Sequence, residues 1–239
     1  MATDCLFRED SYLRDCDATV VAINPDGSIV LDRTVLYANS GGQPADRGML
    51  IARSGATLPL ANVVYCDPGK TVIAHLPAPG AAAEIAVGDA VQATLDWSVR
   101  HARMRMHTAL HLLCAVLPYP VTGGSIGEAE SRLDFDIPEA GLDKDEITAK
   151  LAAMIAADAK VTSRWISDAE LEANPALVKT MAVKPPMGTG RVRLIEIASL
   201  DLQPCGGTHV RSTGEIGAVR VTQIEKKGKL NRRVRLALV

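Results

Sequence analysis

The segment WSVRHARMRMHTALHLLCAVL, residues 97–117, contains neither Gly nor Pro and is rich in residues that favour a helix. Pro118 and Pro120 follow directly, so the sequence predicts a helix over 97–117 that ends before them. His107 and His111 are four residues apart on this helix, where side chains share one face about 6 Å apart. Both imidazoles can then reach one metal ion, although two histidines at a helix surface would give the same pattern.

A second pair with the same separation lies far along the chain, in the segment Pro204-Cys205-Gly206-Gly207-Thr208-His209. Its two glycines permit the backbone angles of a tight chelating loop. One thiolate and three imidazoles satisfy tetrahedral zinc, and thiolate disfavours magnesium and calcium. The two pairs therefore predict one zinc ion per chain, held by His107, His111, Cys205 and His209.

Cys114 is a rival fourth ligand, because it follows His107 by seven residues on the same helical face. Seven residues rise about 10.5 Å along a helix, whereas two atoms bound to one zinc lie less than about 5 Å apart. We therefore expect Cys114 to be a core residue. His75 and His101 have no partner at a chelating spacing, and we expect surface or core roles for them.

The part of the chain before this helix is rich in short β-prone runs. Residues 18–23 and 29–37 flank Asn24-Pro25-Asp26-Gly27, which suits a hairpin turn. Further runs lie at 60–65, 71–76 and 90–95, and no long helical period occurs. The sequence predicts that residues 1–95 form a small antiparallel barrel or sandwich.

Helical and strand patterns mix after residue 96, which predicts an α+β second domain over 96–239. Leu133, Phe135 and Ile137 alternate with aspartates, as in a strand with one polar side. Two further helices are expected at 142–160 and 168–179. The remaining strands are expected at 192–197, 217–225 and 233–239, with a turn at 228–231.

Composition places the chain of 239 residues among ordinary globular proteins, with 47% hydrophobic and 23% charged residues. No run approaches the roughly 18 apolar residues of a membrane helix. The first fifteen residues carry too many charges for a signal peptide. The five cysteines form no CxxC pair, which favours reduced thiols or metal ligation over disulfides. We therefore expect a cytoplasmic protein.

The net charge of −2 excludes a general electrostatic attraction for nucleic acid. Any contact with RNA must come from local basic clusters, for which solvated surface is the alternative interpretation. The first comprises Arg100, His101, Arg103 and Arg105, and the second comprises Lys226, Lys227, Lys229, Arg232, Arg233 and Arg235.

Three smaller features near these motifs each allow two interpretations. Gly41, Gly42 and Gln43 can bring a backbone and an amide close to a ligand, or form a glycine turn between strands. Gly123-Gly124 can line a cleft or turn the chain. The hydroxyl of Thr108 can read a polar substrate group or bond back to its own helix.

Together these motifs resemble the editing region of alanyl-tRNA synthetases. The matching stretches occur in family order and span most of the chain. They are LDRTVLY at 31–37 with GGQPADRG at 41–48, RMHTALHLL at 105–113, and DLQPCGGTHV at 201–210. The chain is most similar to the free-standing AlaX-type editing proteins that retain the domain with the glycine motif. Threonyl-tRNA synthetase editing domains share the histidine and cysteine pattern, but the 41–48 motif favours the alanyl branch.

The resemblance implies a β-barrel-like first domain and an editing domain whose central sheet is packed by helices. It implies zinc ligation by the same four residues, placement of Gly41, Gly42 and Gln43 at the editing site, and recognition of serine by Thr108. The expected activity is deacylation of Ser-tRNA(Ala), and of Gly-tRNA(Ala), at the acceptor end without ATP. We expect the reacting water to be organised by zinc, and no catalytic side chain is assigned.

Two other functions remain open at this point. An HExxH zinc peptidase needs a glutamate base beside its first histidine, and Thr108 occupies that position. A non-catalytic RNA-binding module with structural zinc is favoured by the four protein ligands, because catalytic zinc sites usually keep one position open. Editing of another mischarged tRNA is a variant of the main prediction.

Overall fold

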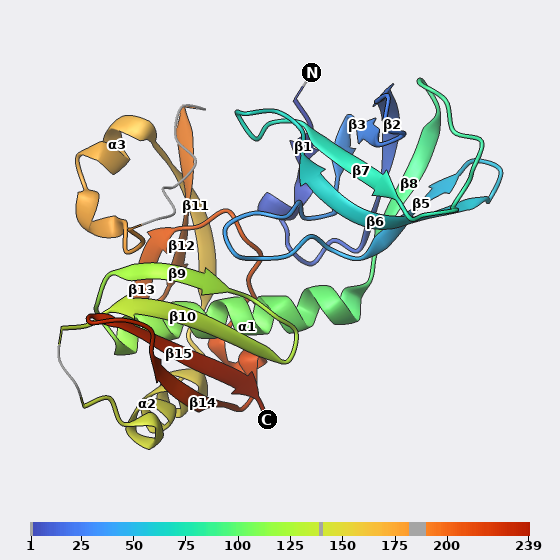
Figure 1. Ribbon diagram of the computed structural model, residues 1–239. Helices are drawn as coiled ribbons and strands as arrows, with labels where there is room; N and C mark the ends of the chain where they lie inside the picture. The colour runs from blue at the N-terminus through green and yellow to red at the C-terminus, as the bar shows by residue number, and fades with distance from the viewer. Residues whose placement is uncertain (1, 139–140, 182–189) are drawn as a thin grey trace. The chain divides into compact units, whose positions relative to one another are not determined.

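The computed structural model describes residues 2–138, 141–181 and 190–239. The chain divides into two compact units (Figure 1). The first unit consists of Met1–Ser40 and Pro44–His101, and the second of Gly41–Gln43 and Ala102–Val239. The short segment Gly41–Gln43 therefore groups with the second unit, although its neighbours along the chain belong to the first.

The first unit contains a closed barrel with the strand order β2-β3-β7-β6-β5-β8, in which neighbouring strands run antiparallel (Figure 1). Its core is mainly aliphatic, as the scarcity of aromatic residues requires. The barrel strands are β2 (Asp15–Ile23), β3 (Ile29–Leu31), β5 (Gly48–Ala52), β6 (Thr57–Tyr65), β7 (Ile73–Pro77) and β8 (Ala90–Leu95). Outside the barrel, β1 (Asp4–Cys5) pairs with β4 (Arg33–Thr34), and η1 (Leu6–Arg8) is a short 3₁₀ turn.

The predicted barrel-like fold is confirmed, because these strands form a closed barrel. The hairpin between β2 and β3 turns at Gly27, whose N–H donates to the carbonyl of Asn24 at 2.9 Å. The prediction of one strand over 29–37 is wrong in length, because the barrel strand ends at Leu31. Beyond β4 the backbone makes isolated hydrogen bonds: the N–H of Tyr37 donates to the carboxylate of Asp46 at 2.7 Å, and the N–H of Asn39 donates to the carbonyl of Val63 on β6 at 3.0 Å.

A fully buried ion pair between Arg100 and Asp46 explains this departure. The guanidinium of Arg100 also donates to the carbonyls of Ser11 and Val35, at 2.9 and 2.7 Å. Because every partner lies inside the first unit, the pair ties the chain after β4 to the start of the helix. A buried charge of this kind is tolerated when hydrogen bonds satisfy it on all sides.

The second unit contains two antiparallel sheets, with strand orders β14-β15-β10-β9 and β11-β12-β13. Helix α2 packs against β14, where the N–H of Val221 donates to the hydroxyl of Thr148 at 3.0 Å. The strands are β9 (Val121–Ser125), β10 (Glu130–Asp136), β11 (Val161–Ser167), β12 (Arg191–Ile197), β13 (Asp201–Pro204), β14 (Val219–Lys226) and β15 (Asn231–Leu238). The helices are α1 (Trp97–Val116), α2 (Lys144–Ala156) and α3 (Asp168–Glu172), with short 3₁₀ turns η2 (Pro175–Leu177) and η3 (Thr213–Ile216).

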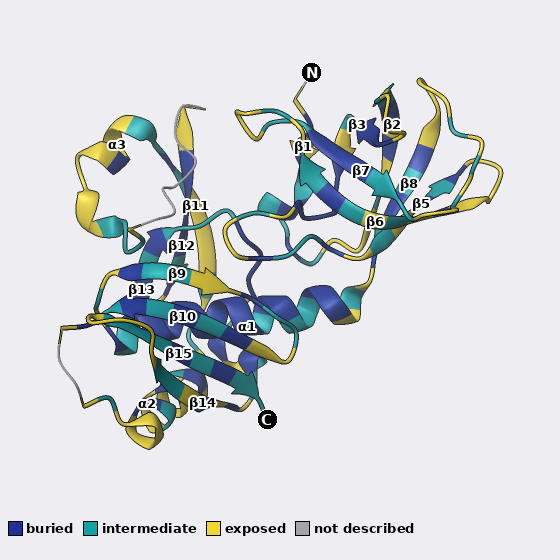
Figure 2. Ribbon diagram, in the orientation of Figure 1, coloured by how far each residue is buried: buried dark blue, intermediate teal, exposed yellow. Residues whose placement is uncertain are grey.

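Helix α1 confirms the expected helix and carries half of the predicted metal ligands. Asp96 caps its first turn by accepting hydrogen bonds from the N–H groups of Ser98 and Val99, at 3.0 and 3.3 Å. It ends at Val116, just before Pro118. Most of the helix is buried (Figure 2), as the helix at the centre of a core must be.

Other expectations for the second unit are partly wrong. The helix predicted over 168–179 stops at Glu172, because Pro175 cannot continue it. Gly123 and Gly124 lie in strand β9 rather than in a turn, and a Cβ at Gly124 would come within 2.8 Å of the Leu133 side chain. Strands β11 and β13 were not anticipated. Within the described part of the chain, every helix is too short or too polar to span a bilayer.

Candidate metal centre

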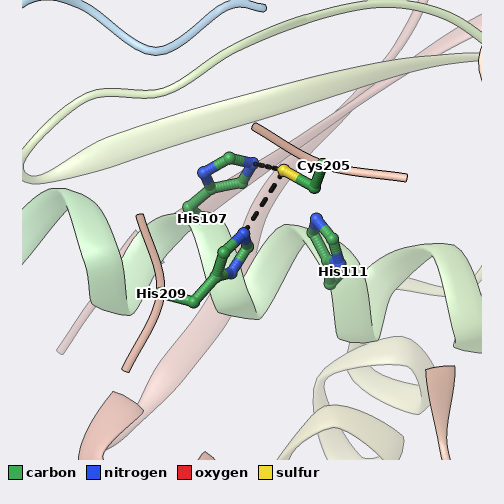
Figure 3. Close-up of side chains that lie close together, drawn as sticks. All are labelled: His107, His111, Cys205 and His209. Atoms are coloured by element: carbon green, nitrogen blue, oxygen red, sulfur yellow. Dashed lines mark hydrogen bonds between the residues drawn. The ribbon is translucent and has the colours of Figure 1, made fainter. Parts of the chain in front are cut away.

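The four residues of the two predicted pairs converge in the second unit (Figure 3). His107 and His111 project from successive turns of α1, while Cys205 and His209 lie in the segment that follows β13. One nitrogen or sulfur atom from each residue lies within 4.8 Å of those of the other three. The three histidines are buried, and Cys205 is partly exposed.

The separations between these atoms match what a zinc ion requires. Sγ of Cys205 lies 3.5 Å from Nε2 of His107 and 3.3 Å from Nε2 of His209. Tetrahedral zinc, with Zn–S about 2.3 Å and Zn–N about 2.0 Å, separates sulfur from nitrogen by about 3.5 Å. Magnesium and calcium are hard cations that prefer oxygen ligands, so three nitrogens and one sulfur do not suit them. The residues therefore fit zinc.

The electrostatics of the cluster favour the thiolate, which is the metal-binding form of cysteine. Burial alone would raise the pKa of the Cys205 thiol. The charges of the neighbouring histidines and the hydrogen bonds from His107 and His111 together outweigh burial and hold that pKa well below its ordinary value. The pKa of His209 is also well below its ordinary value, because burial and the neighbouring charge of His107 both disfavour a second cation.

Each histidine of the cluster is held through its other ring nitrogen. In all three cases Nδ1 faces a side-chain oxygen from a different part of the second unit, so Nε2 is the atom left for the metal. Such outer partners fix the tautomer and the orientation of a ligating imidazole. The pairs are His107 with Oε1 of Gln43 (3.0 Å), His111 with Oδ2 of Asp201 (3.1 Å), and His209 with Oγ1 of Thr108 (3.1 Å).

Asp201 is a functional residue that the sequence reasoning missed. Its buried carboxylate accepts from His111 and from Nε2 of Gln203 (2.8 Å), and it forms an ion pair with Lys179. Burial would raise the pKa of Asp201, but His111 and Lys179 lower it overall. Burial would likewise lower the pKa of His111, but the hydrogen bonds and charges of Asp201 and Cys205 together outweigh burial and raise it to about 9. An acidic residue four positions before Cys205 was the available signal.

Arg193 is a second residue that was missed. From β12 its Nη1 donates to the carbonyl of Gly207 at 2.7 Å, and its own carbonyl accepts from the N–H of Cys205 at 3.0 Å. These bonds hold the Cys205–His209 loop on the edge of its sheet. A Cβ at Gly207 would lie 2.2 Å from Cε1 of His107, so only glycine lets the loop approach the helix this closely.

The glycine motif reaches this centre through Gln43. Gly41 and Gly42 have positive φ angles of 59° and 83°, which residues with a side chain rarely adopt. The carbonyl of Gly42 accepts from the N–H of Ile126 at 2.9 Å, and a Cβ there would lie 3.0 Å from the carbonyl oxygen of Gly124. The motif therefore packs directly on the end of β9, where the second glycine pair gives it room.

Thr108, predicted to recognise serine, is fully buried in the structure. Its hydroxyl donates to the carbonyl of Met104 at 2.9 Å and accepts from Nδ1 of His209 and from the N–H of Val210 (3.3 Å). The hydrogen bond from Thr108 to its own helix, one of the two interpretations of its hydroxyl, is therefore present. Serine recognition by Thr108 stays a prediction.

The remaining histidines and Cys114 lie outside the cluster. Cys114 is buried, and burial above all raises the pKa of its thiol to about 12, as for an unreactive core cysteine. His75 lies in the barrel core, between the hydroxyl of Thr34 and the carbonyl of Ile29, both at 3.0 Å. His101 stacks on Trp97 with ring centroids 5.3 Å apart.

The basic cluster on α1 is used mainly inside the protein. A solvated surface is the wrong interpretation for Arg100, which is fully buried with Asp46. Arg103 pairs with Glu128 at 2.9 Å, and Nε of Arg105 donates to the carbonyl of Ile216 at 2.7 Å. These arginines therefore organise the fold.

The second basic cluster follows the hairpin of β14 and β15. Arg233 pairs with Asp134 at 2.8 Å, and Arg235 pairs with Glu130 at 2.9 Å. Glu225 contacts both Arg235 and Lys227. Part of the positive charge of this hairpin is thus neutralised by neighbouring strands, and the lysines at its tip are exposed.

Two family profiles match parts of the chain. That of the threonyl and alanyl tRNA synthetase second additional domain matches residues 192–235, and that of class II (A) tRNA synthetases matches residues 13–99. The first covers the loop with Cys205 and His209, and the second covers all six barrel strands. The two matches therefore fall on different units of the structure.

Similar whole proteins include two archaeal editing proteins. The alanyl-tRNA editing protein AlaX-M of Methanosarcina barkeri is 35% identical over 244 residues, which cover 99% of both chains. AlaX-M of Saccharolobus solfataricus is 30% identical over 240 residues and 97% of both chains. The alanine–tRNA ligase of Pyrobaculum neutrophilum is 32% identical over 237 residues, covering 92% of this chain and 25% of the ligase.

Proposed function

This chain belongs to the alanyl-tRNA editing protein family, and on that premise we propose that it is a zinc-dependent aminoacyl-tRNA deacylase acting in trans. Its proposed substrates are Ser-tRNA(Ala) and Gly-tRNA(Ala). In this reaction water cleaves the ester between the amino acid and the terminal ribose, and ATP takes no part. The observation that carries the proposal is the convergence of three imidazoles and one thiol in a chain related to editing proteins along its whole length.

The choice of substrates follows from the limits of binding selectivity. A pocket built for alanine rejects glycine poorly, because glycine is smaller and differs by one methyl group. It also rejects serine poorly, because an added hydroxyl costs little in an apolar pocket. Both errors leave the wrong amino acid on the same tRNA, so an enzyme that removes them must recognise the acceptor end of alanine tRNA.

In this proposal His107, His111, Cys205 and His209 hold the zinc ion. Zinc supplies a Lewis acid there, which polarises a carbonyl oxygen or lowers the pKa of water. The protein's part is to keep the ring nitrogens rigid, and the bonds from Nδ1 to Gln43, Asp201 and Thr108 do this. An aminoacyl ester is already activated, so positioning the reactants and the developing oxyanion contributes most of the required acceleration.

Two glycine segments beside the cluster have accessible backbone. A Cβ at Gly206 would meet no other atom within 4 Å, and Gly206 directly follows the partly exposed Cys205. Gly41 and Gly42 are exposed next to the buried Gln43. We propose that the acceptor end of the tRNA approaches between these two glycine segments of the second unit, with Gly41 and Gly42 as contact residues.

A second function deserves a test, because four protein ligands around one zinc ion are usual for structural sites. In this alternative the zinc holds α1 to the Cys205–His209 loop, and the protein binds tRNA without hydrolysing it. The two functions differ in one measurable property, the release of the amino acid from charged tRNA.

The deciding experiment is a deacylation assay on alanine tRNA charged in turn with serine, glycine and alanine. We expect the zinc-loaded protein to release serine at least about tenfold faster than alanine. Equal rates for the two would contradict an editing role. Binding of tRNA with no release of any amino acid would favour the structural alternative.

A pair of cysteine variants controls for the metal. Cys205→Ala is expected to lose both bound zinc and deacylation, whereas Cys66→Ala, which alters an exposed cysteine of the first unit, is expected to retain both. Full activity of zinc-free Cys205→Ala would show that hydrolysis does not depend on this centre.

A further inference from the structure

The side chain of Gln43 makes three hydrogen bonds inside the second unit and is fully buried. Its Oε1 accepts from Nδ1 of His107 at 3.0 Å and from the backbone N–H of Thr208 at 3.1 Å. Its Nε2 donates to Oγ1 of Thr208 at 2.9 Å. One amide therefore connects the glycine motif, helix α1 and the Cys205–His209 loop.

These bonds determine the orientation of the Gln43 amide and the tautomer of the His107 imidazole. A backbone N–H can only donate, so the Gln43 atom that faces the N–H of Thr208 must be the oxygen Oε1. The same oxygen faces Nδ1 of His107, so Nδ1 must carry the proton. In a neutral ring Nε2 then presents its lone pair, and it points at Sγ of Cys205 from 3.5 Å.

Packing on both sides of Gln43 fixes the orientation of its side-chain amide. A Cβ at Gly207 would lie 2.8 Å from Oε1, so the loop packs directly onto the amide. On the other side, the bond between Gly42 and Ile126 holds the backbone of the motif on β9. Both lone pairs of Oε1 are in use, which leaves this oxygen none for a substrate.

We propose that Gln43 is a positioning residue of the metal centre, which sets the tautomer of His107 and clamps the Cys205–His209 loop against α1. It acts on the reaction through His107 and does not contact the ester. Gly41 and Gly42 have a different role from Gln43. Their backbone conformation places Gln43 at this position, and their own backbone stays at the surface. This inference rests on the proposed function in taking the ion to be zinc.

The test compares two substitutions of similar size. Gln43→Met keeps the length of the side chain and removes both the acceptor and the donor. Gln43→Glu keeps an acceptor for His107 and for the N–H of Thr208, and its second oxygen can accept from the Thr208 hydroxyl. Gln223→Met is the matched control, because Gln223 is an exposed glutamine of the same unit.

The main readout is zinc affinity, measured by competition with a chromophoric chelator. We expect Gln43→Met to lose affinity about 10–100-fold, the usual effect of removing an outer partner of a ligating histidine. Gln43→Glu and Gln223→Met should stay within about threefold of the unaltered protein, because the acceptor remains or was never involved. Unchanged zinc affinity in Gln43→Met, together with slower deacylation, would overturn the inference and indicate a direct contact with the substrate.

A measurement on the unaltered protein keeps the inference testable if Gln43→Met does not fold. Nitrogen-15 NMR of the histidine rings, in the zinc-free and the zinc-loaded protein, should show the proton of His107 on Nδ1. A proton on Nε2 would overturn the inference. If the unaltered protein binds no zinc, the proposed function fails, while the zinc-free spectrum still decides the role of Gln43.

Discussion

Two buried histidines, one in each unit, show that burial alone does not decide what a histidine does. His75 in the barrel and His111 in α1 are both almost inaccessible to solvent. Burial lowers the pKa of His75 to about 4, whereas the pKa of His111 is raised to about 9. The difference lies in the partners, since His111 faces the carboxylate of Asp201 and the sulfur of Cys205, whereas His75 faces only neutral groups.

The hydrogen bonds explain why only one of them is suited to bind a metal. Nδ1 of His75 faces the carbonyl of Ile29 and must carry the proton, while Nε2 accepts from the hydroxyl of Thr34. Both nitrogens are therefore used inside the barrel. His111 bonds to Asp201 through Nδ1 and keeps Nε2 for the cluster. A buried histidine is a candidate ligand when one nitrogen remains and its neighbours also offer ligands.

The largest expected effect is the loss of bound zinc when His111 is removed. His111→Ala should reduce bound zinc from about one ion per chain to nearly none, because three donors on a partly opened site bind far more weakly than four. Metal content is measured by plasma mass spectrometry after dialysis. His101→Ala, on the same helix but outside the cluster, is the control and should keep its zinc. Normal zinc in His111→Ala would refute the ligand set.

The next effect is acid destabilisation of the barrel through His75. Its pKa is lowered in the folded state, so the unfolded chain takes up the proton first. The stability from the neutral ring is thus complete above pH 6.5 and is lost as the pH falls towards about 4. The loss is at most about 3 kcal/mol, since each pH unit is worth about 1.4 kcal/mol.

Urea unfolding at several pH values, followed by Trp97 fluorescence, measures this loss. The Trp165→Phe background is used because Trp97 then reports on the first unit. His75→Gln removes the titrating ring, and in this variant the free energy of unfolding should depend less on pH between 6.5 and 4. An equal dependence in both proteins would assign the acid sensitivity to other groups.

A smaller effect is expected when the carboxylate that bonds to His111 loses its charge. Asp201→Asn keeps an oxygen for Nδ1 of His111 and removes the negative charge. Zinc affinity should fall about 10–100-fold, measured by chelator competition. Asp145→Asn, which changes an exposed carboxylate on α2, should leave the affinity as it is. An equal fall in both variants would show a general effect of charge rather than a specific one of Asp201.

The smallest effect concerns the neutral partner of His75. Thr34→Val removes the hydroxyl that donates to Nε2 and should lower the free energy of unfolding of the barrel by about 1 kcal/mol. Because the neutral ring loses a bond, the pKa of His75 should rise towards its ordinary value, which moves the acid transition to higher pH. Zinc content should not change, and a loss of zinc here would contradict the separation of the two sites.

The sequence predicted the parts of the site that depend on local spacing. His107 and His111 were identified because the period of a helix places residues four apart on one face. Cys205 and His209 were identified because two glycines permit a chelating turn. Asp201 and Arg193 were missed, since each acts across a sheet or between elements. The only local signal was an acidic residue four positions before Cys205, and it does not by itself identify the histidine that it contacts.

The fold likewise contains features that nearby residues predict and features that depend on distant residues. The barrel and α1 follow from β-prone runs, a hairpin turn, a run of helix-forming residues and terminating prolines, all of which act within a few residues. The end of β3 at Leu31 and the strand conformation of Gly123-Gly124 depend on partners far along the chain. Arg100 looked like surface charge, and its burial with Asp46 became visible only in three dimensions.

By itself, the sequence predicted the candidate ligands and their pairwise spacing and indicated the family, because all three are properties of short segments and their order. Only the tertiary structure decided which oxygen holds each imidazole, and that Gln43 is enclosed between a helix and a loop. The physical reason is that a hydrogen bond depends on distance and direction in space. Residues 43 and 208 meet because Gly207 has no side chain, and a Cβ there would lie 2.8 Å from Oε1 of Gln43.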